Sequence, residues 1–227
     1  MVTHNTPCFP NSCGLPEPGG PSKHCSVFAV DIAGFGKRDN DVQRAMRHIL
    51  FASLKDAFDY AHVPWNGCYC RDSGDGILTA VPAQFPTLWL ADPLVRNLSA
   101  ALHRHNRLHH EIARIQLRAA LHAGQVQSDD NSISGQSVIH LFRLLQSAAV
   151  RHALAMHDAD IAFIASEYVY QEILQYEYDN AAYEPVDVQV KETITRAWLR
   201  VFGTAVTRRE ALNGRNCWPS ANRASAK

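Results

Sequence analysis

The hydrophobic pattern changes its period repeatedly between residues 24 and 202, and this alternation restricts the folds that the chain can adopt. The run CSVFAVDI at 25–32 is short, β-branched and aromatic, which is typical of a buried strand. Residues 41–63 repeat apolar side chains at helical spacing, with Asn40 or Asp41 as the expected N-cap and Pro64 after the end. The same criteria predict strands at 68–73, 76–82, 114–124, 160–166, 185–190 and 195–203, and helices at 93–109, 137–148, 149–158 and 167–177.

The predicted order is β-α-β-β-α-β-α-β-α-β-β, and its first six elements follow a ferredoxin-like βαββαβ pattern. This pattern predicts an α+β fold with a mostly antiparallel sheet and helices on one face. In this topology the first strand lies beside the hairpin formed by the second and third strands. No linker divides the middle of the chain, so we expect one domain over residues 24–206. Residues 1–23 and 207–227 lack a hydrophobic period, and we expect both tails to be disordered.

Composition narrows the classes of function. The chain has 227 residues and 46% apolar content, which suffices for one substantial core. Lys plus Arg and Asp plus Glu both number 22, and this balance argues against a broad nucleic-acid surface. No apolar run approaches the roughly 20 residues that span a bilayer, and the first thirty residues do not have the order of a signal peptide. We therefore expect a soluble, cytoplasmic protein with no nucleic-acid partner and no membrane span.

Two aspartates are candidates for metal binding. Asp75 lies in RDSGDGILTA (71–80), where Gly and Asp supply the backbone angles of a tight hairpin. Asp31 ends the first strand, which should lie beside this hairpin. Two buried carboxylates repel each other unless a cation lies between them, and a divalent ion with a bound triphosphate would supply that cation. The alternative is that Asp31 caps the following loop and Asp75 only shapes a turn.

The loop IAGFGKRDN (32–40) leads from Asp31 into the first predicted helix. Free N–H groups at the beginning of a helix favour phosphate oxygens. We therefore expect Phe35 and Gly36, within this loop, to contribute to substrate binding.

Four segments together resemble the catalytic domain of class III nucleotidyl cyclases, in the order and spacing of that family. The resemblance covers roughly residues 24–202, and each motif alone is weak. The four segments are VFAVDIAGFG (27–36), RDSGDGILTAVP (71–82), LRAALHAGQV (117–126) and GQSVIHLFRLLQSA (135–148).

The resemblance implies a metal-dependent active site at the interface of a homodimer. In the family two aspartates bind two divalent ions, Mg²⁺ or Mn²⁺, at the triphosphate, and these match Asp31 and Asp75. The carbonyl after the first aspartate, here that of Ile32, also contacts metal. The transition-state arginine of the family falls on Arg143, supplied by the other subunit.

Other positions depart from the family pattern. The asparagine that positions the ribose is replaced by Ile139, which cannot donate or accept a hydrogen bond from its side chain. The base-reading lysine and aspartate of adenylyl cyclases are replaced by Arg71 and Ser132. Arginine offers only donors, so this pair suits a base edge rich in acceptors, such as uracil. The alternative is that Arg71 makes a cross-strand ion pair.

These departures resemble the pyrimidine cyclases of bacterial antiphage defence, whose cyclic nucleotides activate a separate effector protein. The sequence thus predicts an enzyme that cyclises UTP, or next CTP, to a 3′,5′-cyclic nucleotide with release of pyrophosphate. The alternative is a catalytically degenerate cyclase fold that serves as a nucleotide-binding or dimerising regulatory module, and Ile139 favours it.

Overall fold

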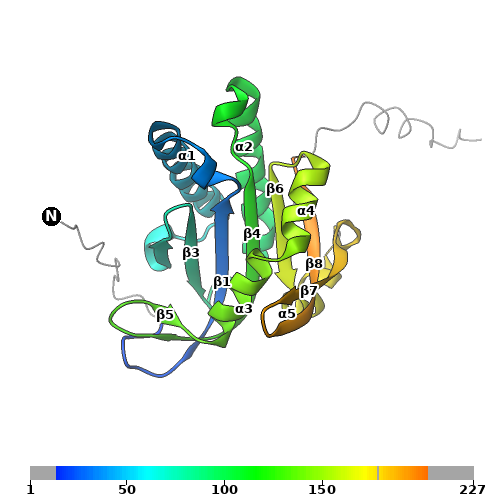
Figure 1. Cartoon of the computed structure of the whole chain (residues 1–227). Coiled ribbons are helices and arrows are strands. Elements are labelled where there is room, and N and C mark those ends of the chain that lie inside the picture. Colours follow the sequence, from blue (N-terminus) through cyan, green and yellow to red (C-terminus); the bar gives the residue numbers. More distant parts are fainter. Residues whose placement is uncertain (1–13, 178, 204–227) are drawn as a thin grey trace, which may run out of the picture.

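The computed structural model describes residues 14–177 and 179–203, which form one mixed sheet with helices on both faces (Figure 1). The strand order is β2-β3-β1-β4-β6-β8-β7, with β5 paired to β4. The pairing of β4 with β6 is parallel and the other pairings are antiparallel. The strands are β1 (Lys23–Ile32), β2 (Tyr69–Asp72), β3 (Gly76–Pro82), β4 (Leu117–Ser128), β5 (Ile133–Ser134), β6 (Ile161–Ser166), β7 (Glu184–Val190) and β8 (Thr193–Phe202).

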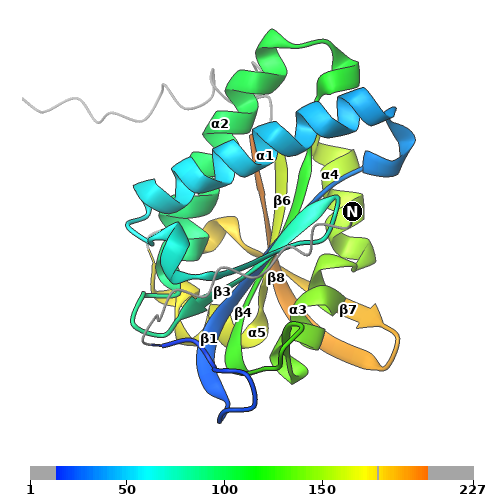
Figure 2. The ribbon, with the colours of Figure 1, turned by 90° about the vertical axis from the view of Figure 1, so that its left-hand side faces the viewer.

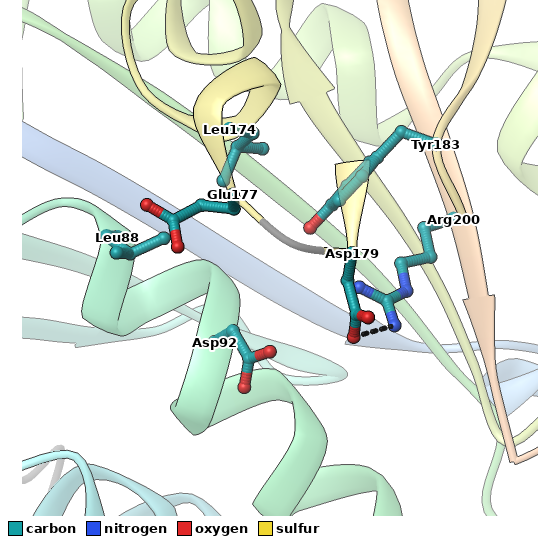
Figure 3. A pocket seen from close by; sticks show the side chains of 7 residues that line it. All are labelled: Leu88, Asp92, Leu174, Glu177, Asp179, Tyr183 and Arg200. Atoms are coloured by element: carbon teal, nitrogen blue, oxygen red, sulfur yellow. Dashed lines mark hydrogen bonds and ion pairs between the residues drawn. The ribbon is translucent and has the colours of Figure 1, made fainter. Parts of the chain in front are cut away.

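The helices divide between the two faces of the sheet. Figure 2 shows α1 and α2 running over one face, and α3 and α4 lie on the other. Short 3₁₀ segments join several elements, and a π-helical turn (Leu90–Leu94) leads into α2. The helices are α1 (Asn40–Tyr60), α2 (Val95–Leu108), α3 (Gln136–Leu145), α4 (Ala148–His157) and α5 (Glu167–Glu172).

The first six elements, β1-α1-β2-β3-α2-β4, confirm the predicted ferredoxin-like core, with its two helices on one face. The helices α3 and α4 come after this core in the chain and cover the opposite face. The structure thus adds a second helical layer to the one that the sequence pattern predicts.

The side chains of β1 point alternately to the two faces of the sheet, so this one strand contributes to the hydrophobic core on each face. Phe28 and Val30 pack toward α1 and α2, whereas Val27 and Ala29 pack toward α3 and α4. Successive side chains of a strand point to opposite faces, so Asp31 belongs to the same face as Ala29. The carboxylate of Asp31 is therefore on the α3–α4 face of the sheet, at the end of β1.

Three details differ from the sequence-based expectations. The N-cap of α1 is Asp39, whose Oδ1 accepts hydrogen bonds from the N–H groups of Asp41 and Val42. The packed region also begins before residue 24: Leu15 is only 5% exposed, and Pro18 forms a bridge with Ser128. The short strand β5 was not expected, because two residues carry no period. The rest of the predicted tails, residues 1–13 and 207–227, lies outside the described residues.

Among the described residues, no helix is both long enough and apolar enough to cross a membrane.

Candidate functional site

Asp31 is a largely buried carboxylate held by an arginine from the neighbouring strand. Its side chain is 14% exposed, and its Oδ1 accepts a 2.6 Å hydrogen bond from Nε of Arg118, its register partner on β4. Burial disfavours the charged form and raises the pKa of Asp31 to about 6, although the Arg118 guanidinium lowers that pKa. A further cation at this carboxylate would favour its charged form.

Asp75 lies directly beside Asp31. The amide of Ile32 donates a 2.8 Å hydrogen bond to the carbonyl of Asp75, and Gly76 stands opposite Asp31 in the β1–β3 register. The negative charge of Asp75 contributes to the raised pKa of Asp31. The structure confirms the expected proximity of the hairpin to the end of the first strand.

The close approach of the two strands explains the glycine after Asp75. A Cβ atom at Gly76 would lie 2.1 Å from the carbonyl oxygen of Val30 and 2.9 Å from Cα of Asp31. A side chain at position 76 would therefore push the hairpin away from β1 and separate the two aspartates.

The other carboxylate of the hairpin, Asp72, shapes its turn. Its Oδ1 accepts hydrogen bonds from the amide of Gly74, at 2.8 Å, and from Nη1 of Arg47, at 2.9 Å. Arg47 comes from α1 and also donates to the Gly74 carbonyl. Its guanidinium holds the pKa of Asp72 below the usual range. Sequence reasoning missed Arg47, because a charged side chain on a long amphipathic helix has no pattern that marks its partner.

A cavity of about 230 Å³ opens between the end of β1, β4 and α4. Two arginines line it: Arg118, the partner of Asp31, and Arg151 from α4. Arg118 lies within a motif that the sequence analysis used, but its role there was missed. Arg151 lies outside the four motifs, and no sequence signal pointed to it.

The loop after β1 turns sharply at Gly34, whose φ of 69° is in the left-handed region that glycine adopts readily. The 3₁₀ turn Phe35–Lys37 follows, and the first N–H groups of a helical turn are not used inside it. At the N-terminus of α1, the amides of Asp41 and Val42 already donate to Oδ1 of Asp39. Phe35 and Gly36 remain proposals for backbone contacts to a phosphate.

Arg71 and Ser132 both lie near Tyr69 on β2. Arg71 is exposed on β2, and it follows Tyr69 by two residues, so the two side chains share a face. The Tyr69 hydroxyl lies 3.3 Å from Oγ of Ser132, in the turn before β5. Both residues expected to read the base therefore lie near Tyr69, and their role in base reading stays a prediction.

Arg143 lies elsewhere on the molecule. It is 15% exposed on α3, and its Nη2 donates a 3.0 Å hydrogen bond to Glu192 in the turn between β7 and β8. The Nε atom of Arg143 is buried without a hydrogen-bond partner among the described residues. Strands β1, β4 and β6 separate the β7–β8 hairpin from β3, so the structure does not bring Arg143 to Asp75 of the same chain. Ile139, one helical turn earlier, is 44% exposed.

The described residues contain no group of three or more histidines, cysteines, aspartates or glutamates that could hold a metal ion. Asp31 and Asp75 are two carboxylates, and a metal bound at this position would need further oxygen ligands.

Neither the protein-family models nor the curated proteins give a match to this sequence. Solved structures, in contrast, do match this chain. An adenylate/guanylate cyclase/hydrolase from Silicibacter pomeroyi is 19% identical with a TM-score of 0.59, covering 81% of this chain and 99% of that one. The guanylyl cyclase Cya2 is 14% identical with a TM-score of 0.56, covering 82% and 95%. A bacterial light-regulated adenylyl cyclase is 14% identical with a TM-score of 0.53, covering 77% and 88%. The chain therefore has the fold of the class III adenylyl and guanylyl cyclase catalytic domains.

Proposed function

We propose that this protein is a metal-dependent nucleotidyl cyclase that acts as a homodimer and converts UTP, or next CTP, to a 3′,5′-cyclic nucleotide and pyrophosphate. The observation that carries the proposal is the pair of carboxylates, Asp31 and Asp75, brought together at one end of a cyclase-fold sheet beside Arg118. The product would act as a second messenger on a separate effector protein, and antiphage defence is the proposed setting.

The residues at this position fit a divalent cation with phosphate oxygens as additional ligands. Carboxylates are the ligands that Mg²⁺ and Mn²⁺ prefer, and the raised pKa of Asp31 reflects burial that Arg118 only partly offsets. Asp31, Asp75 and the Ile32 carbonyl would hold two ions. Bound there, the ions would lower the pKa of the attacking 3′-hydroxyl and neutralise charge on the phosphates.

The chain's own cations would bind and orient the triphosphate. Arg118 lies within hydrogen-bond reach of Asp31, so metal binding would release part of its guanidinium to phosphate oxygens. Arg143 would come from the second subunit and stabilise charge that develops at the α-phosphate. Its separation from β3 within one chain supports a site shared between two chains.

Arg71 and Ser132 support the choice of a pyrimidine. An exposed guanidinium on β2 can donate to the carbonyl oxygens of uracil, whereas the exocyclic amine of adenine would face another donor. The contact of Ser132 with Tyr69 places a hydroxyl near the same strand. An unmatched donor in a desolvated site costs about 1–3 kcal/mol, which corresponds to roughly ten- to a hundredfold in selectivity.

Ile139 supports a second function: a nucleotide-binding or dimerising regulatory module without turnover. Its exposed apolar side chain occupies the position where the family places the ribose-binding asparagine, one turn from Arg143. A ribose held less firmly would react more slowly, because catalysis depends on alignment of the attacking hydroxyl.

One assay separates these functions. Purified protein is incubated with Mn²⁺ and each of the four ribonucleoside triphosphates, and cyclic products are identified by mass spectrometry. The proposal predicts cyclic UMP above all other products. Faster turnover of ATP or GTP would contradict the base assignment alone, and tight nucleotide binding without any cyclic product would favour the regulatory module.

A further inference from the structure

The cavity beside Asp31 has a distinctly cationic lining. Its volume of about 230 Å³ is several times the ~30 Å³ that a water molecule occupies in the liquid, so a phosphate group fits inside. Within the part of the chain that the structure describes, the lining includes two arginines and no acidic residue. The lining residues are Ala33, Gly34, Gln116, Arg118, Arg151, Leu154 and Ala155.

The two arginines differ in their partners. Arg118 bonds the carboxylate of Asp31. Arg151 is exposed at the cavity wall and forms no hydrogen bond or ion pair with another described residue. An arginine without a partner, at the edge of a cavity without acids, is suited to bind an anion.

We propose that Arg151, on α4, is a further phosphate-binding residue of the proposed nucleotide site and contacts the terminal phosphates from the wall of this cavity. The inference rests on the proposed cyclase function and extends it to a helix, α4, that lies outside the four sequence motifs.

The order of the strands favours one direction for a bound triphosphate. Asp75 precedes β3, Asp31 ends β1 and Arg118 begins β4, and β1 lies between the other two strands. The carboxylates are therefore on one side and the arginines on the other. An α-phosphate at the carboxylate-bound ions would direct the β- and γ-phosphates toward Arg118 and Arg151.

The chemistry of the wall suits this role. A guanidinium can donate two parallel hydrogen bonds to one phosphate group, which fixes its orientation as well as its charge. Leu154 and Ala155 form an apolar part of the wall, and partial exclusion of water strengthens an ionic contact. After ring closure, the same residues would hold the pyrophosphate that leaves.

The test uses inorganic tripolyphosphate, because this probe has no base and no ribose. Its affinity in the presence of Mg²⁺ is measured by calorimetry for the full chain and for Arg151→Ala. We expect the variant to bind about tenfold more weakly or worse, and Arg151→Lys to lie between it and the wild type. Arg196→Ala removes an exposed arginine on β8 and is the matched control, with unchanged affinity. Thermal unfolding checks that each variant is folded.

Each outcome separates the inference from the proposed function. A uridine monophosphate, which lacks terminal phosphates, should bind the wild type and Arg151→Ala equally. Equal tripolyphosphate affinity in the two proteins would overturn the role of Arg151 and leave the cyclase proposal standing. If the wild type binds no tripolyphosphate, the role of Arg151 fails, and the assay of cyclic products decides the cyclase proposal separately. If orthophosphate binds as tightly as tripolyphosphate, and its binding depends equally on Arg151, the cavity is a general anion site. The assignment to terminal phosphates is then wrong.

Discussion

The guanidinium of Arg118 donates a 2.6 Å hydrogen bond to the carboxylate of Asp31, across the β1–β4 pairing. This contact supplies the positive charge that a buried carboxylate needs. It also means that any cation arriving between Asp31 and Asp75 meets an aspartate that is already partly neutralised. Metal binding and the position of Arg118 are therefore coupled.

Replacing either aspartate should remove metal binding while leaving the fold intact. Asp31→Asn and Asp75→Asn keep the shape of the side chain but remove a charged oxygen ligand, so Mn²⁺ affinity in the presence of a nucleotide should fall at least tenfold. Electron paramagnetic resonance measures free Mn²⁺ directly, and cyclisation should be lost in parallel. Asp56→Asn, at an exposed position on α1, is the control. Near-normal turnover by either site variant would show that the two-aspartate assignment is wrong.

Mixing two inactive variants should restore activity if the site is shared between subunits. Asp75→Ala removes the metal side and Arg143→Ala removes the transition-state side, so a mixed dimer retains one intact site. Random exchange of subunits should recover up to about a quarter of the wild-type rate, because half of the dimers are mixed and each has one working site of two. No recovery, despite subunit exchange shown by labelled chains, would exclude a site divided in this way.

Substituting Gly76 should destabilise the hairpin and weaken the metal site together. A methyl group there would meet the carbonyl oxygen of Val30 at 2.1 Å, so the backbone has to move. We expect Gly76→Ala to lower the free energy of unfolding by about 1–3 kcal/mol, measured by urea denaturation. Gly36→Ala is the stability control, because a Cβ at Gly36 meets nothing within 4 Å. Equal stability of the two variants would argue against a close approach of β3 to β1.

His122 should make the fold sensitive to mildly acidic conditions. Burial, with smaller effects from His140 and His24, lowers its pKa to about 4, whereas the unfolded chain keeps a value near 6.5. Burial also lowers the pKa of His140, the ring that faces His122. Below pH 6.5 His122 is therefore protonated in the unfolded chain but not in the folded protein. The free energy of unfolding falls as the pH is lowered to about 4.

The loss attributable to His122 should be of the order of 2 kcal/mol between pH 7 and pH 4.5. Denaturation at several pH values, compared with His122→Asn, measures it. The variant loses the hydrogen-bonded contact with Ser166 and so starts less stable, but its stability should depend less steeply on pH. Equal slopes for the two proteins would contradict a neutral, half-buried His122.

The sequence predicted the elements of the fold well, because hydrophobic periods are a local property. The proximity of Asp31 to Asp75 also followed from topology alone, because a ferredoxin-like order makes the first strand adjacent to the hairpin. The choice of N-cap did not follow: Asp39, Asn40 and Asp41 are all acceptable caps, and backbone angles set by the turn after Phe35 decide between them.

The cations around the site could not be predicted in the same way. Arg118 meets Asp31 from 87 positions away, and this pairing depends on the exact register of β1 against β4. Arg151 reaches the cavity because α4 folds back over the sheet face that carries Asp31, a tertiary arrangement that no local period encodes. The contact of Arg143 with Glu192 likewise depends on how closely α3 packs on the β7–β8 hairpin.

The hydrogen bonds of Arg47 to the β2–β3 hairpin limit how this site can evolve or be redesigned. Arg47 belongs to α1, which covers the face of the sheet opposite Asp31, yet it bonds both Asp72 and the Gly74 carbonyl next to Asp75. The smallest transferable piece is therefore the hairpin together with α1, and the hairpin grafted alone onto another sheet would lose its anchor. A substitution of Arg47 would therefore disturb the position of Asp75, although the Arg47 side chain bonds only Asp72 and the Gly74 carbonyl.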